Sequence, residues 1–420
     1  MIKSVQLKTL PFIIFLFGPP AFRKLGDQTN ILVAQVDVWI AIQIILYLFS
    51  FYLMIKFFDR RIILSRNFFD LIIAINLLSL IISALLSNDI ITSLAYTFLY
   101  FIGIYYYYYS KNLYQDINDI KLISIYIFVR NIFTSLLIIV LFFYFFDDSY
   151  VLKDNKIFGG KIVNIAVVSP IVFFISFYLL HKKENNVFNV ICLFISIFFI
   201  FNSFSRTTWW TTIFFTFLLF IKFNFYDNKY KKNLKYKFYT FLTIILIFIL
   251  FFFYYQEIFN FLTRGQSRPF SLSGRDIIAT WVFEQMDGRI FGFGLGTGFK
   301  RMFPSLIGNF DHLGLAAENI GTAHNAYLEI LMAGGWLSFF SYLLFSITIV
   351  IYFLFNFKKI ITSNIYLVYL LFLYQVIINM VNAQSTIPAY SLFFMFWLLL
   401  SLTNINIFHT RKLNENSSNT

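Results

Sequence analysis

Apolar blocks about 20 residues long follow one another along most of this chain, and that block length constrains the fold more than any other feature. Such a block crosses roughly 30 Å of hydrocarbon as an α-helix. The composition agrees, because 59% of the 420 residues are hydrophobic and 13% are charged, against roughly 25% charged in an average soluble domain. The sequence therefore predicts an all-α membrane protein with many crossings and excludes a water-soluble enzyme.

Twelve blocks are long enough to be considered as crossings, eleven of them full-length. The shorter one precedes Pro19 and has the length of a signal-peptide core, but no small-residue cleavage site follows it. We therefore expect an uncleaved first helix. The predicted crossings cover residues 7–18, 38–58, 68–86, 90–109, 122–146, 162–180, 187–203, 207–222, 238–256, 326–355, 363–381 and 386–406.

Lys and Arg are distributed in a way that predicts the topology. Cytoplasmic segments of membrane proteins carry an excess of both residues, and that excess appears here when both termini are placed in the cytoplasm. The densest cluster, six lysines between residues 222 and 237, then lies inside. The net charge of +13 is thereby accounted for by topology, so we expect the lipid bilayer and no nucleic acid as a partner.

One long hydrophilic loop, residues 257–323, divides the chain and falls outside the cytoplasmic face in this topology. Residues 1–256 form the first eight helices, 324–408 the remaining ones, and 409–420 a cytoplasmic tail. Sites concentrate on loops that a rigid scaffold positions, so function is expected in the long loop. Its basic residues are Arg264, Arg268, Arg275, Arg289, Lys300 and Arg301.

Residues 271–288 within the loop predict a short amphipathic helix. Ser273 and Asp276 form a capping box, and Gly288 stands where a C-terminal cap glycine belongs. Arg275 is unusual, because a cation in the first turn opposes the helix dipole. It either joins the free N–H groups in binding an anion such as a phosphate or is a solvated surface charge. The residues predicted to share one face of this helix are Ile278, Trp281, Val282 and Gln285.

Four glycines alternate with other residues in the segment 291–299. A dinucleotide or phosphate-binding loop would require a βαβ unit or a Gly-Lys-Ser/Thr sequence, and neither occurs here. The glycines instead predict a tight turn whose backbone approaches a ligand or a neighbouring helix.

His324 stands at the end of the loop, where the chain enters the next apolar helix. The positive end of that helix, with any nearby arginine, would keep the imidazole neutral and able to act as a general base. The alternative is a structural histidine that caps the helix or bonds to the backbone.

Two further arginines lie among the apolar blocks. Arg206 separates two blocks at the outer boundary, where it could line a cavity, bind an anion or extend its charge to the interface. Arg130 lies deeper, and because a cation at the bilayer centre costs about 2.5–3.5 kcal/mol, it should face a watery cavity or a partner such as a carboxylate or backbone carbonyls.

The sequence offers few metal ligands. Cys192 is the one cysteine and lies in an apolar block, while Asp147 and Asp148 have no companion ligands nearby. We therefore expect neither a metal site nor a disulfide within the chain.

Three motifs between residues 202 and 335, taken in their order, resemble the bacterial O-antigen polymerase and ligase family of integral membrane glycosyltransferases. The matching residues are Ser205-Arg206 followed by tryptophan, Ser-Gly-Arg275 with Trp281 and the glycine run, and His324-Asn325 with Gly334-Gly335.

The resemblance implies a reaction at the periplasmic face of the bacterial inner membrane. A glycan on undecaprenyl diphosphate is transferred to an acceptor hydroxyl with inversion at the sugar and without metal, nucleotide or other cofactor. Arg206 and Arg275 would hold the diphosphate and stabilise the leaving group, while His324 would activate the hydroxyl. Arg289 and Arg301 would guide the anionic donor. The predicted substrate-binding residues are Arg206, Arg275, Arg289, Arg301, Asn325 and Trp281.

Several functions remain open at this point. A polymerase, which we favour because no distinct acceptor-binding module accompanies the compact loop, would extend another lipid-linked repeat unit, with a chain-length regulator as a further partner. A ligase would transfer the glycan to lipid A-core, and related enzymes glycosylate protein. In a different class, a transporter or flippase of lipid-linked saccharide would use Arg130 and Arg206 to line its path, although no internal repeat supports that alternative.

Overall fold

The computed structural model of the chain describes residues 2–17, 38–58, 68–114, 118–146, 165–203, 205–226, 275–297, 325–380 and 391–418. Within these ranges the chain forms thirteen α-helices and one short π-helix, and no strand. The predicted all-α membrane fold is therefore confirmed.

The helices follow the apolar blocks closely. Eleven of the twelve predicted crossings coincide with a helix, and the twelfth, residues 238–256, lies outside the described residues. The elements are α1 (Ile2–Phe17), α2 (Val38–Phe57), α3 (Phe68–Leu85), α4 (Ile90–Leu113), α5 (Asp119–Phe146), α6 (Ile165–His181), α7 (Asn186–Asn202), α8 (Arg206–Ile221), the π-helical η4 (Lys222–Tyr226), α12 (Arg275–Gln285), α14 (Ala326–Phe355), α15 (Phe357–Thr362), α16 (Tyr366–Asn379) and α17 (Ser391–Ser418).

Four of these helices are long and apolar enough to cross a membrane by length and composition: α3, α4, residues 119–142 of α5, and α14. Shorter apolar helices of 10–17 residues accompany them, among them α6, α7 and α16. The chain is a multi-pass membrane protein, and the number of twelve crossings stays a prediction.

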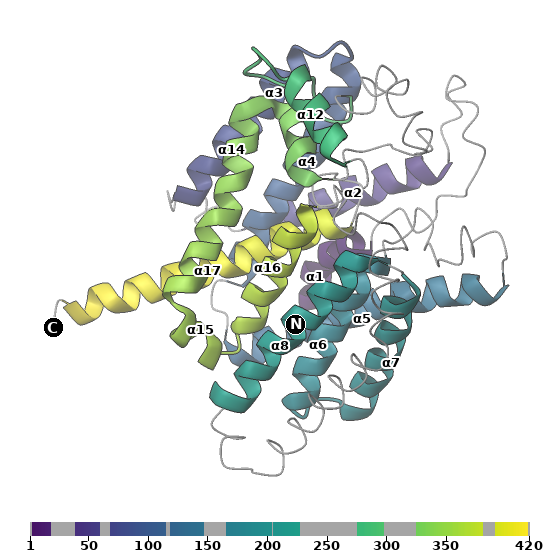
Figure 1. Ribbon diagram of the computed structural model, residues 1–420, viewed down its shortest axis with the longest axis vertical. Helices are drawn as coiled ribbons and strands as arrows, with labels where there is room; N and C mark the ends of the chain where they lie inside the picture. Colours follow the sequence, from purple (N-terminus) through teal and green to yellow (C-terminus); the bar gives the residue numbers. More distant parts are fainter. Residues whose placement is uncertain are drawn as a thin grey trace.

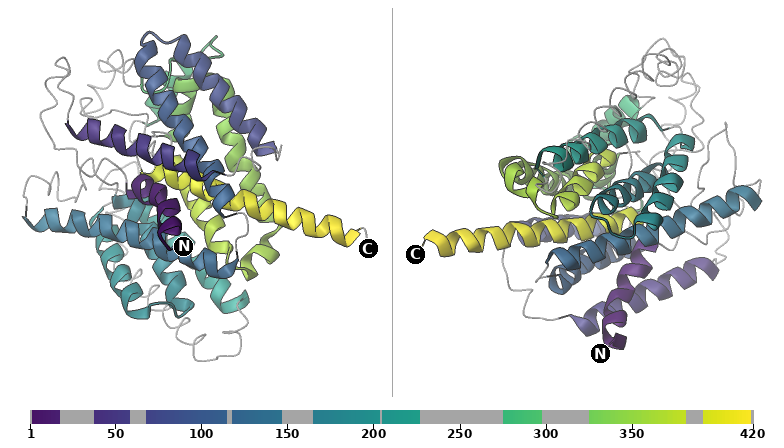
Figure 2. Two further views of the ribbon diagram at one scale, coloured as in Figure 1. Left: turned by 180° about the vertical axis from the view of Figure 1, so that it is seen from behind. Right: turned by 90° about the horizontal axis from the view of Figure 1, so that it is seen from below.

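Both sequence-distant and consecutive helices pack in pairs to form the scaffold (Figure 1). α3 lies along α14, α4 along α17, and α6 along its neighbour α7. Seen from behind and from below, α5 and α17 project from opposite sides of the molecule (Figure 2). Aromatic rings fill the contact between α4 and α17, where Tyr100 meets Trp397 edge to face at 5.7 Å. Such edge-to-face pairs add to the apolar burial.

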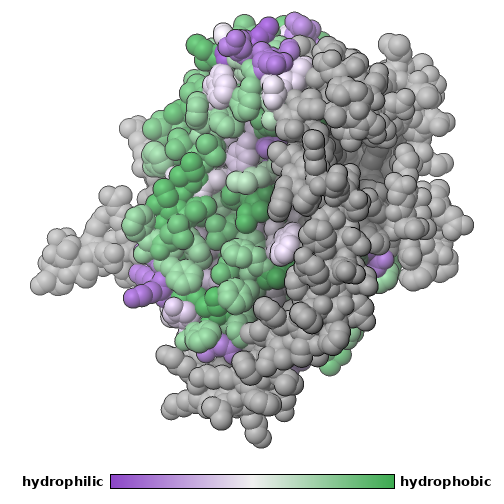
Figure 3. Space-filling view, viewed as in Figure 1, coloured by the Kyte–Doolittle hydropathy of each residue, from purple (hydrophilic) through white to green (hydrophobic). Residues whose placement is uncertain are grey.

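The outward face of α14 is a continuous apolar surface. Figure 3 shows hydrophobic residues over this part of the molecule, with hydrophilic residues gathered at its two ends. The exposed apolar residues recur every three or four positions from Leu337 to Leu354, a length of about 26 Å along a helix. This matches the hydrocarbon thickness of a bilayer, so the break in α14 before Leu337 lies at one edge of the apolar surface.

Polar contacts gather at two ends of the scaffold. At the first, named here the loop end, the α3–α4 turn, residues 289–297 and the start of α14 meet; Ser87 and Thr297 share a hydrogen bond of 3.1 Å. At the second, the lysine end, η4 meets the α15–α16 turn, where Lys222 Nζ donates to the carbonyl of Ser363 at 2.7 Å. Segments predicted on one side of the membrane therefore meet each other, although the orientation itself stays a prediction.

Candidate functional site

α12 is an amphipathic helix, as its sequence pattern predicts, and it packs on the first part of α14. It begins at Arg275, and the chain leaves it through Gly288, whose φ of 67° fits the predicted C-terminal cap. Ser273 of the predicted capping box lies outside the described residues. The two helices share a buried cluster of Ile278, Trp281, Val282, Met286, Leu328, Leu331 and Met332.

Trp281 belongs to this cluster and is 6% exposed. Its described neighbours are apolar side chains of α12 and α14, so it contributes to the burial that holds α12 in place. Its predicted contact with substrate stays a prediction.

Asn325 defines the start of α14. Its side-chain oxygen accepts hydrogen bonds from the backbone N–H groups of Tyr327 at 2.9 Å and Leu328 at 3.2 Å. This N-cap satisfies two of the donors that every helix start leaves without intrahelical partners. The cap uses the side-chain amide oxygen of Asn325 and not its amide nitrogen. The amide N–H groups can therefore still donate to a substrate, which is the predicted role of Asn325.

α14 is broken at Gly335, and the backbone around this break binds the glycine-rich segment. Gly335 has a φ of 80°, and a Cβ at this position would overlap the carbonyl oxygen of Ile290. The break frees backbone groups for bonds between segments: Phe293 N donates to Met332 O at 2.8 Å, and Trp336 N donates to Ile290 O at 3.1 Å. The prediction that the glycines allow close approach to a neighbouring helix is confirmed.

Hydroxyl groups of α3 and α4 secure the same segment from the other side. Ser83 Oγ accepts from Gly292 N at 2.9 Å. Thr297 Oγ1 lies 3.1 Å from Ser87 Oγ and 2.9 Å from Ser93 Oγ. The segment is therefore fixed between the α3–α4 hairpin and the broken helix.

Sequence reasoning missed this contribution of α3. A signal was present, because Ser79 and Ser83 are four residues apart on one face of α3, and Ser87 follows at the same spacing in the turn after it. Ser79 Oγ donates to Gly334 O at 2.6 Å, which extends the contact to α14. Hydroxyls strengthen such helix contacts where no water competes.

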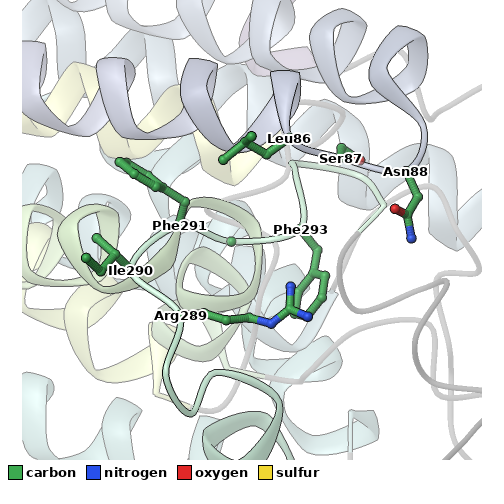
Figure 4. A pocket seen from close by; sticks show the side chains of 8 residues that line it. Leu86, Ser87, Asn88, Arg289, Ile290, Phe291 and Phe293 are labelled. Carbon is green, nitrogen blue, oxygen red and sulfur yellow. The ribbon is translucent and has the colours of Figure 1, made fainter.

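A pocket of about 380 Å³ opens between the α3–α4 turn and the segment after α12. Arg289 lines it, and the guanidinium lies over the Phe293 ring at 4.4 Å from the centroid (Figure 4). The turn contributes Leu86 and Asn88, which the sequence analysis did not identify. Arg289 is exposed and, within the described ranges, forms no ion pair.

The other predicted site residues are only partly described. Arg206 begins α8, and Ser205 caps that helix by accepting from Thr208 N at 3.4 Å. The side chains of Arg206 and Arg275 lie outside the description, as do His324 and Arg301 altogether. The predicted grouping of these residues is therefore neither confirmed nor contradicted.

Arg130 lies apart from these residues, near the lysine end. It is 1% exposed, donates to the side-chain oxygens of Asn131 and Asn189, and stacks on Phe188 at 4.7 Å. The sequence predicted a carboxylate or backbone carbonyls as one kind of partner for the guanidinium. Among the described residues, its hydrogen-bond partners are instead the side-chain amides of Asn131 and Asn189. This enclosure is consistent with the structural role that the sequence left open for Arg130.

Metal ligands do not cluster in the part of the chain that the structure describes. There, no three His, Cys, Asp or Glu side chains lie together where they could hold an ion.

Taken together, these features define a multi-pass, all-α membrane protein whose polar side chains gather at two ends of an apolar scaffold. Within it, residues 191–343 match the O-antigen ligase family model. The match contains every predicted site residue and segments of α7, α8, α12 and the first part of α14 around them. It supports the O-antigen polymerase and ligase family that the motifs resemble. Neither the comparison with curated proteins nor that with solved structures found a match.

The family match has a functional consequence. It indicates an O-antigen ligase- or polymerase-type membrane enzyme with glycosyltransferase-like chemistry and a lipid-linked glycan as substrate.

Proposed function

We propose that this protein polymerises undecaprenyl-diphosphate-linked repeat units at the periplasmic face of the bacterial inner membrane. The observation that carries the proposal is the family match, because it covers the region in which the candidate cations and His324 are concentrated. The absence of a distinct acceptor-binding module from the sequence favours the polymerase branch over the ligase.

In the proposed reaction, an acceptor sugar hydroxyl attacks the anomeric carbon of the donor glycan from the face opposite the diphosphate. The new carbon–oxygen bond forms as the bond to the diphosphate oxygen breaks, which inverts the configuration. The leaving undecaprenyl diphosphate takes the electron pair. His324 accepts the proton of the hydroxyl as a general base.

Arg206 and Arg275 stabilise the charge that develops on the leaving diphosphate. Preorganised cations at such a position contribute more to the transition state than to the ground state. The anchoring of α12 on α14 supports this role, because it gives the Arg275 backbone a rigid support. Arg301 adds positive charge for the anionic substrates, and no step requires a metal ion.

The first test is transfer by purified protein in metal-free liposomes that contain an undecaprenyl-diphosphate repeat unit. A ladder of longer lipid-linked glycans is expected from the wild type and should be lost in His324→Ala. His409→Ala is the matched control, since it removes an imidazole from the predicted cytoplasmic end and should retain the ladder. An unchanged ladder in His324→Ala would overturn the role of His324.

A ligase is the second candidate, and the name of the matching family model favours it. The same liposomes with lipid A-core added separate the two branches. Transfer to lipid A-core that requires both substrates, without any ladder, would establish the ligase. Movement of the lipid-linked glycan across the membrane without any transfer would instead indicate a flippase, although the enclosed Arg130 provides no open path for it.

A further inference from the structure

The pocket at the loop end has two chemically different walls. Arg289 and Asn88 present a cation and an amide, while Leu86 and Ile290 are apolar side chains with exposed fractions of 65% and 67%. Exposed apolar groups beside a cation suit a ligand that combines an anionic head with a hydrocarbon chain.

The pocket also lies next to the end of the apolar face of α14. Ile290 is hydrogen-bonded through its carbonyl to Trp336 N, and the outward apolar face of α14 begins at the next residue, Leu337. The pocket therefore borders the apolar face of α14. A lipid could place its head at Arg289 and keep its chain in the hydrocarbon.

Arg289 is well separated from the start of α12. Arg275 opens this helix, whose first and last residues lie about 15 Å apart along the axis, and Arg289 follows four residues after the end. No residue of α12 lines the pocket. One diphosphate is therefore not expected to bridge Arg275 and Arg289, and the two cations belong to different subsites.

We propose that this pocket binds the diphosphate of a second polyprenyl lipid, the one that carries the acceptor. Arg289 and Asn88 bind its phosphate oxygens, and Leu86 and Ile290 contact its first isoprene units. The inference rests on the proposed function, because polymerisation joins two substrates that both carry undecaprenyl diphosphate. It reassigns Arg289 from the donor, where the sequence analysis placed it, to the acceptor.

The test counts bound lipids. The full chain, in nanodiscs of zwitterionic phosphatidylcholine, is titrated with undecaprenyl diphosphate and examined by native mass spectrometry. We expect two lipids per wild-type chain and one per Arg289→Gln chain. Lys358→Gln is the matched control, since it removes an exposed cation at the lysine end and should retain two. Because Arg289 is exposed, its variant should keep the thermal midpoint of the wild type.

Other numbers of bound lipids would contradict the proposal. A single lipid on the wild type, or two on Arg289→Gln, would overturn the pocket assignment. Displacement of the second lipid by an equal amount of phosphatidylglycerol would show a general site for phospholipid phosphates and would also overturn it. These counts need no catalysis, so a failure of the proposed transfer reaction would be recognised separately.

A kinetic measurement complements the count. With donor at saturation, Arg289→Gln should raise the KM for the lipid-linked acceptor roughly 10- to 100-fold, the effect of losing one charge-assisted contact, and leave kcat within about twofold. Asn88→Ala should raise the same KM by a smaller factor. A rise in the donor KM instead would return Arg289 to the donor subsite.

Discussion

The two polar ends of this protein use their cations in opposite ways. At the lysine end, Lys222 is 2% exposed and donates to the carbonyls of Ile361 and Ser363, and Arg130 is enclosed by amides. At the loop end, Arg289 is exposed beside a pocket. A buried cation needs its partners within the protein, whereas an exposed one can exchange water for the anion of a ligand. The enclosed cations of the lysine end therefore stabilise the fold, whereas the exposed Arg289 supports the binding that we propose for the loop end.

The backbone differs between the ends in a related way. At the lysine end, the carbonyls that terminate α15 accept from Lys222, which satisfies groups that every helix end leaves open. At the loop end, α14 breaks at Gly335 so that its backbone can bond the glycine-rich segment. At the loop end, part of the regular helical hydrogen bonding is thus replaced by bonds to an irregular segment. Irregular segments on a rigid scaffold are where sites usually lie.

The largest effect should come from Arg275→Gln. Loss of a cation that stabilises the leaving diphosphate is expected to lower the transfer rate about 100- to 1,000-fold. Lys358→Gln, the control, removes a cation from the lysine end and should leave the transfer rate unchanged. Only a cation of the proposed site should therefore affect the rate. Initial rates in liposomes at matched protein amounts provide the measurement. Equal rates for wild type and Arg275→Gln would remove Arg275 from the site.

Gly335→Ala should be the most destabilising change at the loop end. The Cβ of the new alanine would overlap Ile290 O, and the alanine would have to adopt the positive φ of Gly335, which side chains disfavour. We therefore expect a loss of about 2–4 kcal/mol in the free energy of unfolding. Gly288→Ala is the matched control: its φ is similar, but nothing lies within 4 Å of the added Cβ, and about 1–2 kcal/mol should be lost. Equal losses in denaturant titrations would show that the contact with Ile290 is unimportant.

At the lysine end, Lys222→Met should lower stability without altering the chemistry. The carbonyls of Ile361 and Ser363 would lose their donor, at an expected cost of about 2 kcal/mol in the free energy of unfolding. Transfer per folded molecule should stay at the wild-type level. The exposed Lys359→Met serves as the control and should change neither property. A lower rate at full stability would contradict the purely structural role of this end.

The smallest effect is expected from Thr297→Val, which removes the hydroxyl that joins Ser87 and Ser93. We expect the free energy of unfolding to fall by about 1 kcal/mol. Thr362→Val removes an exposed hydroxyl at the other end and should cost much less. If both variants unfold at the same denaturant concentration, the hydroxyl contacts do not secure the loop end.

Much of the fold follows from local sequence properties. The apolar blocks predicted α14 and α16 within a few residues, and Gly288 predicted the end of α12. Two features escaped prediction. Residues 326–355 were predicted as one crossing without the break that Gly335 introduces, and the α3–α4 turn was not recognised as a pocket wall. The break at Gly335 depends on contact with Ile290, and the pocket wall depends on contact of the α3–α4 turn with residues 289–293. These partners lie about 40 residues or more apart in sequence, so no local pattern reveals them.

The sequence by itself determined that the chain spans a membrane as helices, because every buried backbone group in hydrocarbon needs an internal partner and block length follows bilayer thickness. It also located the arginines and the histidine of the family motifs. Only the tertiary structure decided which cations are enclosed and which are accessible, since Arg130 and Arg289 carry the same charge and differ in their neighbours. Those neighbours come from distant helices, and helix packing depends on three-dimensional shape complementarity that hydrophobicity along the chain does not specify.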